Sequence, residues 1–200
     1  MKNKICFISI ILIITSVVAR CDNPIKTGDF VMPFENSNYK VTFTYDETID
    51  FAKKLAAGSD LIQYSEIGIS PQGRAIPLLI LDKNKNFDVT SVRKSGNAVL
   101  LVQANIHPGE PDGNDAGMML LRDIAIKGQN TNLLNQVTIL FLPVVSPDGL
   151  ARFGPHNRIN QNGPEQMGWR TTAQNFNLNR DFVKADAPEM QAWLKFFNAW

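Results

Sequence analysis

One of the two histidines in this chain lies three residues before a glutamate. His107 and Glu110 belong to the segment His107-Pro108-Gly109-Glu110, which directly follows an apolar run at 98–106. Imidazole and carboxylate are both zinc ligands, and Pro108 and Gly109 favour a tight turn that would bring the two side chains onto one ion. Taken alone, these four residues are equally compatible with a histidine and a glutamate that only pair with each other at the end of a strand.

Three further polar groups follow along the chain. Ser146-Pro147-Asp148-Gly149 ends a second apolar run, Trp169-Arg170 lies in a polar segment, and Asn179-Arg180 comes near its end. An arginine can hold a carboxylate through two parallel hydrogen bonds or stabilise developing negative charge. For Arg180 alone, pairing with a nearby acid such as Asp181 is the alternative. Pro-Asp-Gly is a turn signature, so Asp148 is predicted to be a turn residue without a chemical role.

The scaffold for these residues is predicted from hydrophobic periodicity. The runs at 98–106 and 137–145 are nearly continuous, which is typical of strands covered on both faces. An apolar helix over 116–125 separates them, in the order of a parallel crossover unit. An amphipathic helix over 44–58 and a hairpin over 62–81 precede them. We therefore predict an α/β fold with a mixed, largely buried sheet and helices on both faces.

The last part of the sequence is less regular. Residues 146–178 form a long polar loop, and a loop of that length inside a compact domain is expected to be functional. A final helix is predicted to begin at Asp186, with Glu189 completing a capping box. The chain stops at Trp200 inside this apolar helix without a cap, which predicts a domain that is incomplete at its C-terminus.

The N-terminus has the layout of an export signal. Two lysines precede an uncharged apolar run, so residues 1–19 are predicted to be a signal peptide and residues 20–43 a leader segment. The protein is then expected in the periplasm or outside the cell, either free or held by a lipid on Cys21. Cleavage leaves 18 basic and 19 acidic residues, and this balance gives no electrostatic case for binding nucleic acid.

Four separated motifs together resemble one family. The segments at 107–110, 146–149, 169–170 and 179–182, with the hairpin IGISPQGRAIPLLIL at 67–81, are similar in order and spacing to the zinc carboxypeptidases of the carboxypeptidase A/B type. The resemblance covers residues 44–200, which would be the N-terminal part of the catalytic domain.

The resemblance assigns roles to individual residues. His107 and Glu110 match two zinc ligands, and Arg170 matches the arginine that stabilises the oxyanion of the tetrahedral intermediate. Asn179 and Arg180 match the pair that binds the terminal carboxylate of a peptide substrate. These matches imply an exported zinc-dependent exopeptidase that hydrolyses C-terminal residues through a metal-activated water.

Two departures from the family pattern matter. Many members carry an arginine just before the glutamate ligand, where this chain has Gly109, so that charge is either absent or supplied elsewhere. The third ligand and the general base lie beyond the Asn-Arg motif in the family, and no histidine follows Arg180 here. His156 precedes that motif and is predicted to be a surface or supporting residue. The 200-residue chain alone is therefore expected to be inactive.

Other functions share these features. An amidase acting on cell-wall peptides or acylated amino acids could use the same scaffold. A metal-free exported protein that binds carboxylates is a second alternative, and a purely structural exported domain is a third. The sequence does not separate them.

Overall fold

A computed structural model describes residues 27–200. The predicted signal peptide and the possible anchor at Cys21 lie outside these residues. No helix in the described range is long and apolar enough to cross a membrane. In chain order the elements are η1 (Thr27–Phe30), α1 (Pro33–Asn36), α2 (Tyr45–Gly58), β1 (Ile62–Ile69), β2 (Ala75–Leu81), α3 (Val89–Ser95), β3 (Ala98–Gln103), α4 (Asp112–Ala125), η2 (Thr131–Asn135), β4 (Val137–Leu142), α5 (Pro147–Ala151), η3 (Leu178–Arg180) and α6 (Pro188–Ala199).

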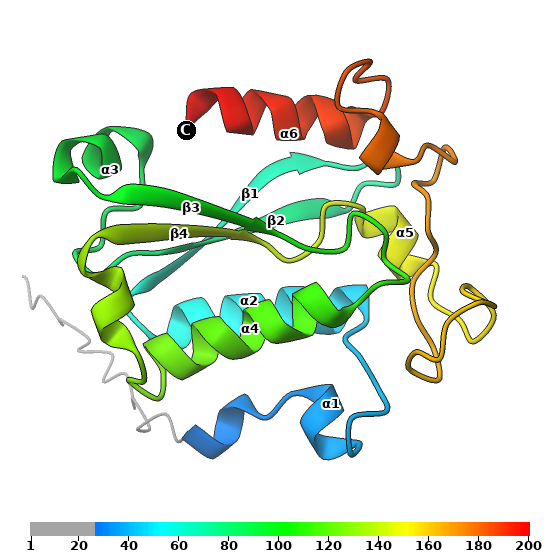
Figure 1. The fold of residues 1–200 in the computed structure, drawn as a ribbon, viewed down its shortest axis with the longest axis horizontal. Helices are drawn as coiled ribbons and strands as arrows, with labels where there is room; N and C mark the ends of the chain where they lie inside the picture. The colour runs from blue at the N-terminus through cyan, green and yellow to red at the C-terminus, as the bar shows by residue number, and fades with distance from the viewer. Residues whose placement is uncertain (1–26) are drawn as a thin grey trace, which may run out of the picture.

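The four strands form one mixed sheet in the order β1-β2-β4-β3. β1 pairs antiparallel with β2, and β2 pairs antiparallel with β4. β3 and β4 are parallel and are joined through α4, as expected for a crossover unit. Figure 1 shows α2 and α4 against one face of the sheet and α6 against the other. The predicted α/β class, mixed sheet and helices on both faces are therefore confirmed.

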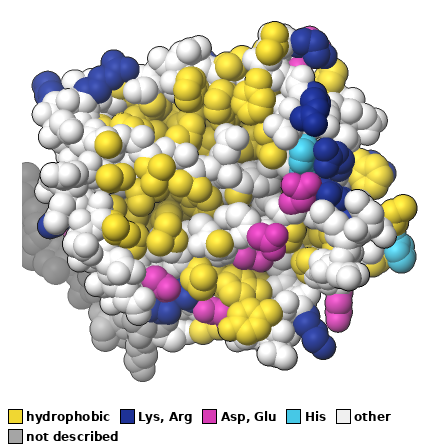
Figure 2. Space-filling view, viewed as in Figure 1, with side chains coloured by type: hydrophobic (Ala, Val, Ile, Leu, Met, Phe, Trp, Pro, Cys, Tyr) yellow, Lys and Arg dark blue, Asp and Glu magenta, His cyan; other side chains and the backbone are white. Residues whose placement is uncertain are grey.

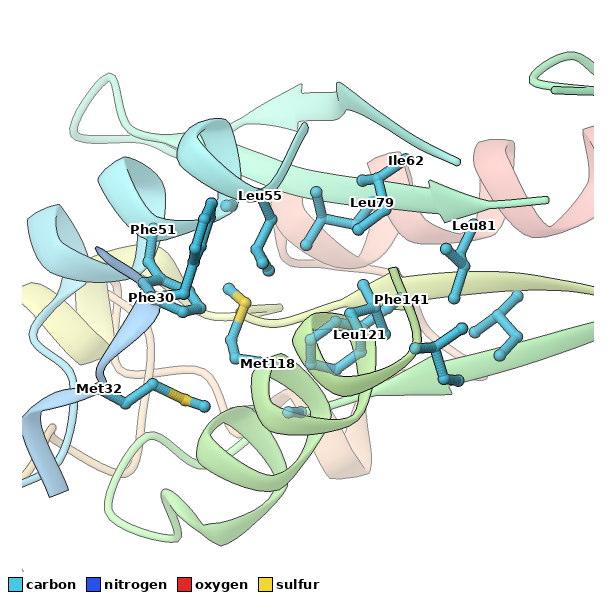
Figure 3. Packing of buried hydrophobic residues seen from close by; sticks show 14 of the residues in the cluster. Phe30, Met32, Phe51, Leu55, Ile62, Leu79, Leu81, Met118, Leu121 and Phe141 are labelled. Atoms are coloured by element: carbon cyan, nitrogen blue, oxygen red, sulfur yellow. The ribbon is translucent and has the colours of Figure 1, made fainter. Parts of the chain in front are cut away.

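The face under α2 and α4 carries a closed hydrophobic core (Figure 3). Phe141 of β4 lies under α4, where a side-chain carbon at Gly117 would be 2.2 Å from its ring, so a residue without a side chain allows this close approach. The segment predicted as a leader takes part in this core, because Phe30, Met32 and Phe43 are buried in it.

The opposite face is only partly covered. Met190, Trp193 and Phe196 of α6 pack on it. β3 is an edge strand of this sheet, with Val99 41% and Leu100 48% exposed, and Figure 2 shows broad hydrophobic areas on the molecule. Val99 and Leu100 are consecutive and point to opposite faces, so β3 is partly exposed on both. The prediction of burial on both faces is thus correct for β4 and wrong for β3, because an apolar run does not reveal how far the covering elements extend over an edge strand.

Two helix starts also differ from the prediction. α4 begins at Asp112, four residues early, since its polar first turn hides it from hydrophobic periodicity. α6 begins at Pro188, and Asp186 and Glu189 do not form a capping box. Instead, the Asp181 carboxylate accepts from the backbone N–H groups of Asp186 and Ala187 at 3.1 and 2.8 Å, while Glu189 is buried inside.

Candidate active site

The site lies just beyond the parallel ends of β3 and β4. Ala104 N donates to Leu142 O at 2.8 Å, and Ser146 N donates to Asn105 O at 3.1 Å. The segments that follow β3 and β4 therefore continue side by side after the strands end. The segment after β3 then leads into α4, and the segment after β4 leads into α5. Side chains that follow both strands consequently meet at the carboxyl edge of the sheet, where α/β folds bind their ligands.

His107 and Glu110 converge within this turn. Glu110 N donates to His107 O at 2.8 Å, which closes the turn, and His107 Nδ1 lies 3.5 Å from Glu110 Oε1. The His107 side chain is 5% exposed, whereas that of Glu110 is 45% exposed. The predicted convergence of the two side chains is present, with the imidazole fixed from inside and the carboxylate facing the outside.

The far side of the imidazole is held by Asn177. Its Oδ1 lies 2.9 Å from His107 Nε2 and also accepts from Asn179 N at 3.2 Å. An amide oxygen can only accept, so Nε2 donates in this contact and Nδ1 is the ring nitrogen that faces Glu110. A metal-binding histidine is ordinarily oriented in this way by a partner on its other nitrogen.

These two side chains fit a zinc ion. Two ligand atoms about 2 Å from a tetrahedral zinc are about 3.3 Å apart, close to the observed 3.5 Å between Nδ1 and Oε1. The donor set of one imidazole nitrogen and one carboxylate oxygen is also one that zinc prefers. Residues 27–200 contain no cluster of three or more potential metal-binding side chains, so the described chain offers two ligands at this point.

Two arginines face Glu110. Arg158 Nη1 lies 2.9 Å and Arg170 Nη1 3.4 Å from Glu110 Oε1. Burial raises the pKa of the Glu110 carboxyl, but the hydrogen bond from Arg158 and the positive charges nearby outweigh it, so the net pKa is lowered. The carboxylate is therefore kept ionised, as a ligand must be. Figure 2 shows basic, acidic and His side chains gathered at one edge of the molecule.

The predicted carboxylate-binding pair, Asn179 and Arg180, makes no side-chain hydrogen bond with His107 or Glu110. Asn179 is linked to His107 through Asn177, whose Oδ1 contacts both. Asn179 and Arg180 are exposed in η3, directly after Asn177. The Arg180 guanidinium donates to Asn179 O at 2.8 Å and has no ion pair within the described residues. Asp181 is not its partner, because that carboxylate caps α6. The structure thus brings His107, Glu110 and Arg170 together, whereas Arg180 is connected to them only through the chain at Asn177 and Asn179 and pairs with no carboxylate of residues 27–200.

The loop at 152–180 is anchored on the turn by backbone contacts at glycines. Gly168 N donates to Pro108 O at 3.1 Å, and Trp169 N donates to Gly149 O at 2.7 Å. A side-chain carbon at Gly168 would lie 2.5 Å from Pro108 Cβ. The loop reaches the turn only because no side chain intervenes, and this contact sets the position of Arg170.

Asp148 and His156 have different surroundings. Asp148 is buried in α5 and accepts from Ser70 Oγ, Gln72 N and Arg74 Nη1 at 2.7, 3.1 and 2.9 Å. Its role is to fasten the β1–β2 turn to α5, which the local Pro-Asp-Gly signature did not reveal. His156 is exposed in the loop.

Two residues at this site were not predicted from the sequence. Asn177 stands two positions before Asn179, and Arg158 lies 48 residues after Glu110. The repeated asparagine before Arg180 was a usable signal for Asn177. No local pattern identified Arg158, because its contact depends on how the loop folds back over the turn.

Comparisons with known proteins identify the family of this chain. The family model described as zinc carboxypeptidase matches residues 48–196. Carboxypeptidase 2 of Trichophyton rubrum is 32% identical over 146 residues, which cover 70% of this chain and 24% of that protein. Carboxypeptidase 2 of Trichophyton equinum is 31% identical with the same coverage. The chain spans about a quarter of the length of these relatives.

Solved structures share the fold. A metallo-carboxypeptidase from Burkholderia cenocepacia superposes with a TM-score of 0.59 at 20% identity, covering 79% of this chain and 38% of that one. Carboxypeptidase A from Helicoverpa armigera gives 0.58 at 20% identity, with 78% and 42% covered. At this identity the likeness shows the fold alone, whereas the family model matches most of the chain. The chain belongs to the zinc carboxypeptidase family.

Proposed function

We propose that the protein containing this chain is an exported zinc-dependent exopeptidase that removes residues from the carboxyl end of peptides. The observation that carries the proposal is the approach of His107 Nδ1 to Glu110 Oε1 at 3.5 Å, with Asn177 holding the other ring nitrogen. Family membership supports a carboxypeptidase-type peptidase. Export is proposed from the sequence of residues 1–19, with Cys21 as a possible lipid anchor.

In this proposal His107 and Glu110 are two of the zinc ligands, and the remaining ligand and the general base come from outside residues 1–200. Bound zinc supplies a Lewis acid that lowers the pKa of a coordinated water and polarises the peptide carbonyl. Asn177 fixes the tautomer of His107, so that Nδ1 is the nitrogen available to the metal.

The arginines act on the substrate. Arg170 stands 3.4 Å from Glu110, beside the metal position, where a fixed positive charge can stabilise the oxyanion of the tetrahedral intermediate. Within residues 27–200 no carboxylate pairs with Arg180, which together with Asn179 can bind the terminal carboxylate of the peptide. That contact would restrict cleavage to the chain end.

Zinc binding by the full-length protein tests the proposal. His107→Ala should lose most of the bound zinc, measured by metal analysis after dialysis, and should abolish peptide hydrolysis. His156→Ala is the matched control because it removes the chain's other histidine, and it should retain both properties. Circular dichroism of the two variants establishes that both are folded. Equal zinc content in the wild type and His107→Ala would contradict the assignment.

Substrate analogues distinguish the alternatives. Peptides with a free terminal carboxylate should be cleaved, while the same peptides with an amidated end should not. Arg180→Gln should raise KM for the free peptides. Cleavage of cell-wall peptides or acylated amino acids only would favour an amidase on this scaffold. Peptide binding without zinc in the wild-type protein would favour a carboxylate-binding module.

A further inference from the structure

Arg158 crosses the turn at the position where Gly109 has no side chain. A carbon placed at Gly109 as Cβ would lie 2.4 Å from Arg158 Cγ and 2.7 Å from Arg158 Cδ. Gly109 does not have a positive φ, so an alanine would be compatible with its backbone. The space that a side chain at 109 would fill is instead occupied by the stem of an arginine from the loop.

The guanidinium of Arg158 is held at both ends. Nη1 donates to Glu110 Oε1 at 2.9 Å. In the amide orientation that satisfies both of its ends, Gln161 accepts from Arg158 Nη2 at 2.8 Å and donates to Gly109 O at 3.1 Å. The Arg158 side chain is 10% exposed. We refer to Gly109, Arg158 and Gln161 as the Arg158 clamp.

Glu110 needs such a partner. Its side chain is 45% exposed, and a hollow lined by Pro111, Asp112, Gln161 and Asn162 opens beside it. A free glutamate in this position would rotate among several conformations, and ordering it would cost free energy when a metal binds. The Arg158 guanidinium is itself fixed, because Nη1 bonds to Glu110 and Nη2 to Gln161. Its hydrogen bond to Glu110 therefore restricts the rotation of the carboxylate before a metal binds.

We propose that Arg158 is a positioning residue that holds the Glu110 carboxylate toward His107 Nδ1 and thereby strengthens zinc binding. The inference rests on the proposed function in one respect, that His107 and Glu110 are zinc ligands. Glu110 Oε1 accepts from Arg158 at 2.9 Å and from Arg170 at 3.4 Å. A carboxylate oxygen has two lone pairs, so if a metal displaces the longer contact, Oε1 keeps the bond to Arg158 and offers an electron pair to the metal. Partners of this kind commonly affect metal affinity by about 10- to 100-fold.

The clamp predicts a specific pattern in a double-mutant cycle on the full-length protein. Arg158→Gln should raise the Kd for zinc about 10- to 100-fold, measured by competition with a chromophoric chelator. Gly109→Ala should raise it similarly, because its methyl group displaces the stem of Arg158. Since both changes act through one contact, the double variant should be no worse than either single variant. Arg152→Gln removes the same charge from the same loop without a contact to Glu110, and should change the Kd less than twofold.

The absorption spectrum of the cobalt-substituted protein provides a second readout, which a purely structural role would leave unchanged. Arg158→Gln should alter the visible bands, because the carboxylate binds with a different geometry, while Arg152→Gln should not. Unchanged zinc Kd in Arg158→Gln, or tighter binding, would overturn the clamp. The proposed function fails separately, if His107→Ala binds zinc as the wild type does.

Discussion

Two segments deliver side chains to the site, the 104–110 turn and the 152–180 loop, and they are held in different ways. The turn continues from β3 and is bonded to the end of β4 through backbone groups of Ala104 and Asn105. The loop contains only two short regular elements, an isolated bridge between Gly154 and Met167 and the 3-10 helix η3. It is attached to the 104–110 turn at single points such as Gly168, which bonds to Pro108.

This difference separates His107, a proposed zinc ligand, from Arg170, which is proposed to act on the substrate. His107 is placed by the sheet and is nearly inaccessible, while Arg170 is 40% exposed and depends on the attachment of the loop. Loops are generally less constrained than the strands they connect. His107 should therefore keep its geometry under changes that displace Arg170.

The largest expected effect comes from separating the loop from the turn. Gly168→Ala would put a methyl group 2.5 Å from Pro108 Cβ and 2.9 Å from Pro108 O, which are ring and backbone atoms that cannot rotate away. Overpacking of this kind should lower the free energy of unfolding by about 1–3 kcal/mol, measured by urea denaturation of the full-length protein.

Gly154→Ala is the control in the same loop. Its new methyl group would have nothing nearer than Asn157 at 3.8 Å, so its stability should stay within about 0.5 kcal/mol of the wild type. Gly168→Ala should also lower kcat more than it weakens zinc binding, because it moves Arg170 more than His107. An equal loss of zinc binding would show that the two segments are not separable.

A pH-dependent effect tests the helix that continues the turn. Burial raises the pKa of Asp115 in α4 to about 6, against a hydrogen bond from Thr42 that lowers it. The folded protein then holds this proton at pH values where the unfolded chain has lost it, so stability falls as the pH rises from about 4 to 6. Asp115→Asn should remove this loss and gain about 1–2 kcal/mol at pH 7, with little gain at pH 4.

Thr42→Val sharpens the same test. It keeps the shape of the side chain but removes the hydroxyl that donates to Asp115 at 2.7 Å. The pKa of Asp115 should rise further, and the pH range over which stability falls should move upward. Denaturation curves at pH 4, 5.5 and 7 would measure both variants. A stability difference for Asp115→Asn that is the same at all three values would contradict the pKa assignment.

The same division explains what the sequence could predict. His107 and Glu110 were predictable because a buried strand, a Pro-Gly turn and a ligand pair are neighbours in the chain. Arg158 was not, because its contact with Glu110 depends on a close approach at Gly109 that no local pattern encodes. The capping of α6 failed for a similar reason, since Asp181, five residues before Asp186, took the place of the expected local cap.

The smallest expected effect concerns the backbone of the turn itself. Asn105 has a φ of 50° and is buried, and neither end of its side-chain amide has a hydrogen-bond partner among the residues that the structure describes. Glycine adopts this φ without strain, whereas alanine does not. Asn105→Gly should therefore be about 1 kcal/mol more stable than Asn105→Ala in urea denaturation.

The adjacent residue supplies a control of opposite sign. Ala104 is buried next to Asn105 but does not have a positive φ, so Ala104→Gly should be less stable than the wild type by about 1 kcal/mol. If alanine at 105 were as stable as glycine, the backbone there could relax to another φ without cost. The turn would then be as adaptable as the loop, and His107 would not be fixed by the sheet.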